Sequence, residues 1–253
     1  MTTPSTRPND FEGIMGEKYV KTMRVICPQH EEAKRRLKRE IEYRVWNSMV
    51  ENSRPRTLLD LGCGGAEFIR ELNDFQRLKL KFIGIDSSPV MIKKAIQEVQ
   101  GSYRAYPNSY IKITRADITD YLKAMILLGQ TVDIVTTNFV LHNFTNEERA
   151  KTLPLIYEAI SPGGWLYMND KIVRTNPQAH ARDLRLQYRR IESLAEKGMP
   201  ELVQPWKNHY AYDESPERKM TEKNLKISLR EVGFKEVRVF YRYGMDAVLE
   251  ARK

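Results

Sequence analysis

The sequence predicts an α/β protein with a doubly wound, mostly parallel sheet. Apolar strand-like runs alternate with helical patterns over residues 56–173, and a glycine-rich turn follows the first of these runs. The C-terminal segment 235–251 reads as a hairpin, which would add an antiparallel edge to the sheet. The 253 residues suffice for one such domain with short additions.

The first strand and its turn form the most informative segment. Residues 58–61 read Leu-Leu-Asp-Leu, and the Gly-Cys-Gly-Gly sequence 62–65 would let the backbone turn sharply toward a ligand. No Lys-Ser or Lys-Thr follows, so the turn is not a triphosphate-binding P-loop. Asp60 would repel a phosphate but attract an ammonium group, which favours a cationic amino-acid ligand over a pyrophosphate.

Four further strand-like segments follow in chain order, and a polar residue stands at or just after the end of each. Because ligands bind at the carboxyl ends of such strands, these residues predict one shared site. An acid after the second strand is also where a ribose-binding carboxylate is expected. The four polar residues are Asp86, Asp117, Asn138 and Asp170.

Helical patterns fill the spaces between the strands. An apolar stripe runs through residues 11–52 at helical spacing, and the Asn-Ser-Arg-Pro sequence 52–55 would end this region. Thr145 followed by Glu148 is a capping signal that predicts a helix start. Further helices are expected over residues 91–100, 145–160, 182–197 and 220–232.

The ordered set of motifs resembles the class I S-adenosylmethionine (SAM)-dependent methyltransferases, which have a Rossmann-like fold. The resemblance implies SAM as the cofactor, a single cofactor site and no metal. It assigns the methionine portion, the ribose and the adenine to successive strand ends. The implied contacts are Asp60, Gly62, Cys63, Gly64 and Asn138 for methionine, Asp86 and Ser87 for ribose, and Asp117 and the Ile118 N–H for adenine, with Met91, Tyr19 and His30 as further cofactor contacts.

The end of the fourth strand indicates the class of acceptor. Residues 138–142 read Asn-Phe-Val-Leu-His and resemble the small-molecule branch, not the Asn/Asp-Pro-Pro-Tyr tetrad of enzymes that methylate DNA bases or protein glutamine. His142 could serve as a general base, since its ordinary pKa of about 6.5 suits that task, or it could pack beside the cofactor. Asp170 could orient a substrate amine or cap the next segment. Tyr210 is a candidate contact from a lid.

Residues 80–173 resemble one subfamily more closely, the carboxy-SAM synthases, which join a carboxylate-bearing fragment to the SAM methyl group. That resemblance implies an arginine in the lid that pairs with the added carboxylate. The corresponding position falls near Tyr210, where there is no arginine, and neither Arg218 nor Lys207 is a clear equivalent. The favoured prediction is therefore methyl transfer to a small molecule. Synthase-like chemistry or intramolecular cyclisation of SAM stays open as the alternative.

The net charge of +9 and the pI of about 9.4 would suit an RNA-associated binding module. The basic residues of 34–39 and 182–190, however, recur at helical spacing as solvated helix faces do, so nucleic acid is not favoured as a partner. Cys27 and Cys63 give neither a disulfide framework nor metal-ligand spacing, so no metal is expected.

The organisation of the chain follows from these segments. The polar start lacks the apolar region of a secretory signal, and no apolar run has membrane-spanning length, which predicts a cytoplasmic protein without a membrane partner, monomeric or homodimeric. The prolines and aromatic residues of 198–217 predict an irregular connector or a substrate lid. The expected parts are a disordered tail 1–10 and a single domain 11–253, with an N-terminal helical cap 11–52 and a helix and lid insertion 174–217.

Overall fold

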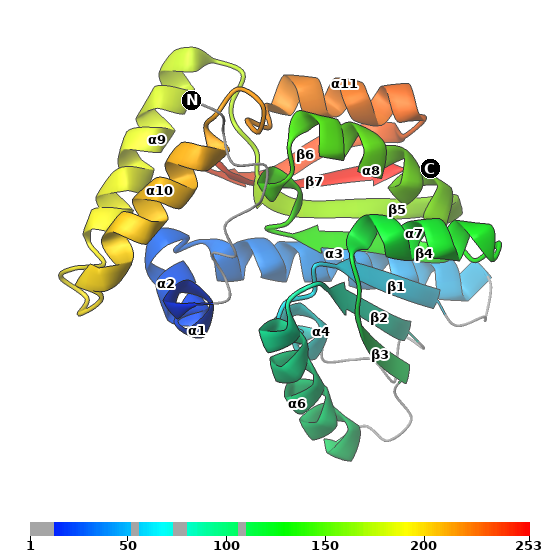
Figure 1. Cartoon of the computed structure of the whole chain (residues 1–253). Coiled ribbons are helices and arrows are strands. Elements are labelled where there is room, and N and C mark those ends of the chain that lie inside the picture. Colours follow the sequence, from blue (N-terminus) through cyan, green and yellow to red (C-terminus); the bar gives the residue numbers. More distant parts are fainter. Residues whose placement is uncertain (1–12, 52–55, 73–79, 106–109) are drawn as a thin grey trace.

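The computed structural model describes residues 13–51, 56–72, 80–105 and 110–253, and a seven-stranded sheet lies at its centre (Figure 1). The strand order is β3-β2-β1-β4-β5-β7-β6. β1 to β5 pair in parallel, whereas β7 runs antiparallel to both of its neighbours, so the predicted sheet is confirmed. The strands are Arg56–Leu61 (β1), Leu80–Asp86 (β2), Tyr110–Arg115 (β3), Val132–Asn138 (β4), Ile160–Lys171 (β5), Lys235–Tyr243 (β6) and Asp246–Arg252 (β7).

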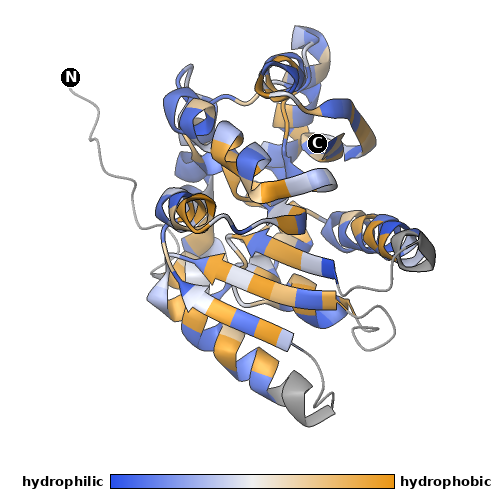
Figure 2. Ribbon diagram, turned by 90° about the vertical axis from the view of Figure 1, so that its right-hand side faces the viewer, coloured by the Kyte–Doolittle hydropathy of each residue, from blue (hydrophilic) through white to orange (hydrophobic). Residues whose placement is uncertain are grey.

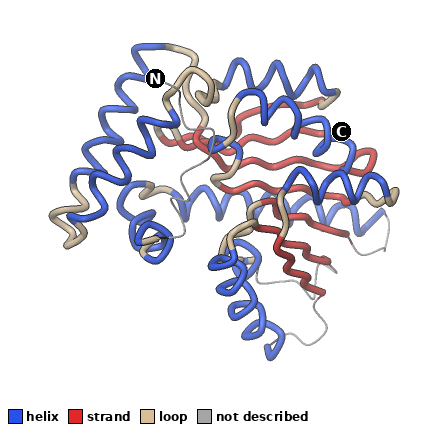
Figure 3. The backbone as a smooth tube through the Cα atoms, in the orientation of Figure 1, coloured by secondary structure: helices blue, strands red, loops and turns tan. Residues whose placement is uncertain are grey.

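Helices cover both faces of the sheet (Figure 3). Leu59 and Leu61 pack in one core cluster and Leu58 in the other, because successive side chains of a strand point to opposite faces. The hydropathy colouring shows long apolar stretches in the strands, while the helices carry both apolar and polar residues (Figure 2). One face carries α7 (Ile118–Leu127), α8 (Asn146–Ala159) and α11 (Glu222–Val232), and the other carries α3 (His30–Glu51), α4 (Glu67–Glu71) and α6 (Pro89–Ala105).

A third layer of helices lies at one end of the sheet (Figure 1). Its apolar cluster joins Met23 and Ile26 from the N-terminal region with Leu194, Leu202 and Trp206, so the predicted cap and insertion pack against each other. We call this group the helical layer. It consists of α1 (Ile14–Glu17), α2 (Tyr19–Ile26), α9 (Pro177–Glu192), η2 (Pro200–Leu202) and α10 (Val203–Asp213).

The prediction of an irregular segment over 198–217 is wrong, because most of it is helical. Pro200 is the first residue of η2, and Pro205 lies in the first turn of α10, where a backbone N–H has no intrahelical acceptor to lose. Pro216 follows the end of α10. These prolines therefore begin and end helices.

Side-chain caps set the boundaries of three other helices. Thr145 and Glu148 form the predicted capping box at the start of α8. Asn176 caps α9, with Pro177 at its first position, so this helix begins and ends earlier than the predicted 182–197. Thr221 caps α11. The predicted tail and the predicted helix end at 52–55 lie outside the described residues.

Candidate functional site

The turn after β1 requires glycine. Gly62 has φ +70° and Gly64 has φ +54°, in the left-handed region that other residues avoid. A Cβ atom at Gly62 would lie only 2.5 Å from Cγ2 of Val140. The turn therefore packs closely against the segment that follows β4. This place lies between β1 and β4, where the strand order of the sheet reverses.

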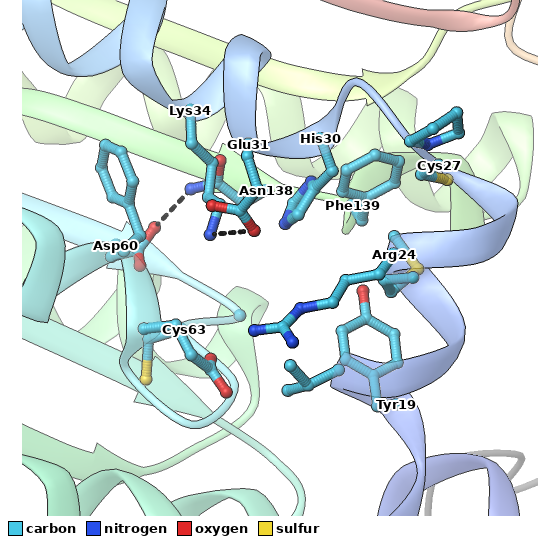
Figure 4. Close-up of a pocket in the computed structure, with 16 residues that line it drawn as sticks. Tyr19, Arg24, Cys27, His30, Glu31, Lys34, Asp60, Cys63, Asn138 and Phe139 are labelled. Atoms are coloured by element: carbon cyan, nitrogen blue, oxygen red, sulfur yellow. Dashed lines mark hydrogen bonds and ion pairs between the residues drawn. The ribbon is translucent and has the colours of Figure 1, made fainter.

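A cavity of about 330 Å³ opens between this turn and the helices α2 and α3 (Figure 4). Six of the predicted cofactor contacts line it, from the strand ends on one side and from the helices on the other. The structure therefore brings together residues that are far apart in the sequence. These six are Tyr19, His30, Asp60, Gly62, Cys63 and Asn138.

Asp60 is a buried carboxylate in the wall of this cavity. Its Oδ1 accepts hydrogen bonds from the Thr136 hydroxyl at 2.7 Å and from the Asn138 side-chain amide at 3.4 Å. Burial raises the pKa of Asp60 to about 7, although these two bonds oppose the shift. Among the described residues no lysine or arginine is paired with Asp60, so a cationic ligand group would meet a carboxylate that has only neutral donors.

Asp86 ties the glycine turn to the second strand. Its Oδ2 accepts from the Gly64 N–H at 3.0 Å, and its Oδ1 accepts from the Ser88 N–H at 2.8 Å. Burial raises the pKa of this carboxyl, and the backbone hydrogen bonds oppose that rise. Asp86, the exposed Ser87 and the half-buried Met91 lie outside the 330 Å³ cavity, as does Gly64.

Asp117 has a structural task in addition to its predicted one. It caps α7, and its Oδ1 accepts from the backbone N–H groups of Thr119 and Asp120 at 2.8 and 3.2 Å. Ile118 begins the helix, where backbone N–H groups have no intrahelical acceptor. Both residues follow β3, and the Ala116 N–H donates to the Asp86 carbonyl at 3.0 Å, so they neighbour the end of β2. They do not line the cavity.

His142 lies in the short helix η1 (Leu141–Asn143) after β4 and pairs with Asp170. The distance from its Nδ1 to the Asp170 Oδ1 is 2.5 Å, and Asp170 also accepts from the backbone N–H groups of Leu141 and Lys171 at 2.9 Å. Burial alone would lower the pKa of His142, but the charges of Asp170 and Asp213 outweigh it, so the pKa is raised. Asp170 thereby fixes the orientation of the imidazole.

Buried hydrogen bonds from Arg149 hold η1 in place. Its guanidinium donates to the carbonyls of Leu141 and Phe144 at 3.0 and 2.5 Å, and to the carbonyl of Arg218 at 2.5 Å. Arg149 is only 5% exposed, so these are charge-assisted bonds away from water. They fix the loop that carries His142.

Phe139 separates His142 from the cavity. It lines the cavity, and its ring centroid lies 5.2 Å from that of His30 and 6.1 Å from that of His142. Its φ of +55° is unusual for a phenylalanine. The structure thus places His142 and Asp170 directly behind one wall of the cavity.

Tyr210 is not among the residues that line the cavity. It is buried in the helical layer, with its hydroxyl 4.0 Å from the Cys27 sulfur and its ring 4.2 Å from the Lys171 Nζ. Burial raises the pKa of its hydroxyl well above the usual range. Of the two basic residues considered beside it, Arg218 donates to the Asn143 carbonyl and Lys207 to Glu192.

Charged residues from α2, α3 and α4 also line the cavity, and no motif in the sequence had indicated them. Arg24 extends from α2 toward the turn that carries Cys63 (Figure 4). Lys34 pairs with Glu31 at 3.1 Å and with Glu71 at 2.6 Å. Val20 and Arg24 are four residues apart, and this spacing places both cavity residues on one face of α2. The missed charged residues are Arg24, Glu31, Lys34 and Glu67.

Comparisons with known proteins agree with this geometry. A family model described as a methyltransferase domain matches residues 59–166. The carboxy-S-adenosyl-L-methionine synthase of Psychromonas ingrahamii is 26% identical over 197 residues, which cover 77% of this chain and 74% of that protein. The enzyme of the same name from Helicobacter pylori is 25% identical over 223 residues, covering 83% and 82% of the two chains.

Solved structures share the fold at low sequence identity. The magnesium protoporphyrin IX methyltransferase of Synechocystis with bound SAH has a TM-score of 0.62 and 16% identity, with 96% of this chain and 97% of that chain covered. A SAM-dependent methyltransferase of Archaeoglobus fulgidus has a TM-score of 0.57 and 16% identity, with 93% and 99% covered.

Residues 59–166 form a methyltransferase domain, and the fold of the chain is that of class I SAM-dependent methyltransferases. Within that class, the carboxy-SAM synthases are distant relatives at about a quarter identity. The fold implies SAM as the cofactor. None of the helices in the described parts of the chain has the length and apolar content needed to cross a bilayer.

Proposed function

We propose that this protein transfers the methyl group of SAM to a small-molecule acceptor. The observation that carries the proposal is the buried Asp60 carboxylate, which faces a cavity beside a glycine turn and has only neutral hydrogen-bond donors. The cavity volume of about 330 Å³ is in the range of small-molecule sites. SAM, when bound, supplies an electrophilic methyl group on a sulfonium.

Residues that line the cavity, together with residues at the ends of β2 and β3 beside it, would position the cofactor. Asp60 would accept from the ammonium group, and the glycine turn would lie against the methionine portion. Asp86 would accept from the ribose hydroxyls, because each of its oxygens has a second lone pair beyond the backbone bond it already accepts. Asp117 and the Ile118 N–H would hold the adenine.

The acceptor would be prepared from the other side of Phe139. Asp170 accepts from Nδ1 of His142, which leaves Nε2 as the nitrogen that can act on an acceptor. Methyl transfer is an in-line displacement, so most of the protein's contribution lies in holding donor and acceptor in line. We propose His142 as the residue that prepares the nucleophile and Asp170 as the residue that orients it.

A second candidate function is synthase-like chemistry, in which a carboxylate is attached to the SAM methyl group. Arg24 favours it. Arg24 lines the cavity and makes no ion pair within the described residues, so its guanidinium could bind an added carboxylate. The relatives named carboxy-SAM synthase support the same alternative.

Mass spectrometry of the small molecules released from the denatured protein tests both functions. We expect SAM or S-adenosylhomocysteine, and a carboxylated SAM would instead support the second candidate. A protein that is empty and fails to bind added SAM in calorimetry would refute both. We further propose a cytoplasmic location, since Cys27 and Cys63 are both free and buried, as is usual in a reducing compartment.

A further inference from the structure

Two histidines and an aspartate meet behind Phe139, outside the cofactor cavity. His142 comes from η1, whereas His209 and Asp213 are one turn apart on α10. Each of the three is less than a tenth exposed. Their ligand atoms all lie within 4.8 Å of one another. The group therefore combines three separate metal-ligand side chains in a buried place.

The distances within this group fit a shared ion better than direct hydrogen bonds. Nε2 of His209 lies 3.5 Å from the Asp213 Oδ2, and Nε2 of His142 lies 3.9 Å from the same oxygen. Hydrogen bonds between such atoms are usually about 2.7–3.2 Å long. Two ligands that each lie about 2.0–2.1 Å from a tetrahedral zinc ion are about 3.4 Å apart. The three ligand atoms lie within 4.8 Å of one another, so binding one ion together would need side-chain shifts of up to about 1 Å.

The surroundings of His142 are those of a metal ligand. A histidine that binds a metal usually donates its other ring N–H to a carboxylate, which fixes the ring and its tautomer. Asp170 has this position on Nδ1 of His142, at 2.5 Å. With the proton on Nδ1, Nε2 carries the free lone pair of the ring, and this lone pair can bind a metal ion.

Asp213 supplies an independent sign of a missing cation. It is 4% exposed, and its Oδ1 has no hydrogen-bond partner in the described part of the chain. A buried carboxylate oxygen without a partner is costly, so such atoms usually mark an ion or a water. Lys171 approaches only Oδ2 of Asp213, at 3.4 Å, and also lies 3.5 Å from Oε1 of Glu214.

We propose that His142, His209 and Asp213 bind one divalent transition-metal ion. Two imidazoles and one carboxylate suit zinc, iron or cobalt. Three protein ligands leave a coordination position for water or for an oxygen or amine of the acceptor. An ion there would polarise that group in place of proton transfer to Nε2 of His142, because Nε2 would then bind the ion, and only this catalytic role rests on the proposed function.

Metal titration of the full-length protein, without SAM or acceptor, tests the site. Metal-free protein is titrated with Zn²⁺ in a calorimeter and with Co²⁺ while the visible absorption of tetrahedral cobalt is recorded. We expect one ion per chain. His209→Ala and Asp213→Asn should each weaken binding by at least about 100-fold, because each removes a ligand and second partners alone are worth 10–100-fold.

The matched control is His180→Ala, which removes another buried histidine from α9 that pairs with Glu214 and is no part of the proposed site. It should bind Zn²⁺ as the wild type does. Asp213→Asn keeps the shape of the side chain, so its Zn²⁺ affinity still tests the site if His209→Ala does not fold. Absence of stoichiometric binding by the wild type, or an equal loss in His180→Ala, would overturn the proposal. SAM binding by the same proteins is measured separately, so a failed metal site and a failed cofactor site give different results.

Discussion

Raising the pH from about 5.5 to about 7 should tighten the binding of SAM by about 15-fold, through the ionisation of Asp60. Burial raises the pKa of this carboxyl from 3.8 to about 7 in the ligand-free protein. The ligand ammonium attracts only the ionised form. Binding therefore lowers the pKa of Asp60 again and releases a proton.

The magnitude follows from the ionised fraction of Asp60. With a pKa of about 7, roughly 3% of the Asp60 carboxyl is ionised at about pH 5.5 and about half at about pH 7. The dissociation constant of SAM should fall by the ratio of these two ionised fractions. The amino group of SAM stays charged over this range, since α-amino groups titrate near about pH 8. The same carboxyl ionises at about pH 3.8 in the unfolded chain but only at about pH 7 in the folded protein. The folding stability of the ligand-free protein should therefore fall as the pH rises from about 3.8 to about 7.

The assay is isothermal calorimetry of SAM binding at several pH values in the wild type and in Asp60→Asn. Asparagine keeps an oxygen for the Thr136 hydroxyl but does not ionise, so its SAM affinity should be weak and nearly constant with pH. Methylthioadenosine, which lacks the amino-acid part, is the control ligand, and its binding to the wild type should not show the change that Asp60 causes. A flat wild-type profile, or the same slope in Asp60→Asn, would refute the reasoning.

Three other changes have expected outcomes. Asp86→Ala should weaken SAM binding by about 1.5–3 kcal/mol, measured by calorimetry, because hydrogen bonds to a charged group are lost; unchanged affinity would remove Asp86 from the site. Gly62→Ala should lower the free energy of unfolding by about 1–3 kcal/mol, since a Cβ would contact Val140 at a positive φ. Gly13→Ala, where a Cβ meets no atom within 4 Å, is its control in denaturant melts, and equal stabilities would contradict the reason given. Arg149→Leu should cost about 3 kcal/mol of folding stability because it leaves buried carbonyls without donors, and a loss below about 1 kcal/mol would show that water replaces the guanidinium.

The strands of the sheet could be predicted because each is a local apolar run that ends at a polar residue. Asp60, Gly62 and Asn138 were found for the same reason, since the positions of strand ends decide which side chains share the crevice. The helix α10 was missed, because prolines were taken as breaks in a segment where they stand in first turns. With α10 unrecognised, the helical spacing of His209 and Asp213 could not be seen.

The charges of the cavity wall lay beyond sequence reasoning for another reason. Arg24 and Lys34 reach the cavity because α2 packs at the end of the sheet and α3 packs on one of its faces, and no local pattern states that packing. Likewise, the meeting of His142 with Asp213 depends on the contact between the segment after β4 and α10. Side chains brought together by tertiary packing need the three-dimensional structure.

The helical layer joins the two ends of the chain. Met15 of α1 and Met23 of α2 pack in one cluster with Trp206 and Met245, so the helix that forms part of the cavity wall rests on residues from much later in the chain. On the ribosome, the N-terminal helices emerge long before these partners. The wall of the cavity that carries Tyr19 and Arg24 can therefore gain this packing only after the chain has been synthesised as far as Met245.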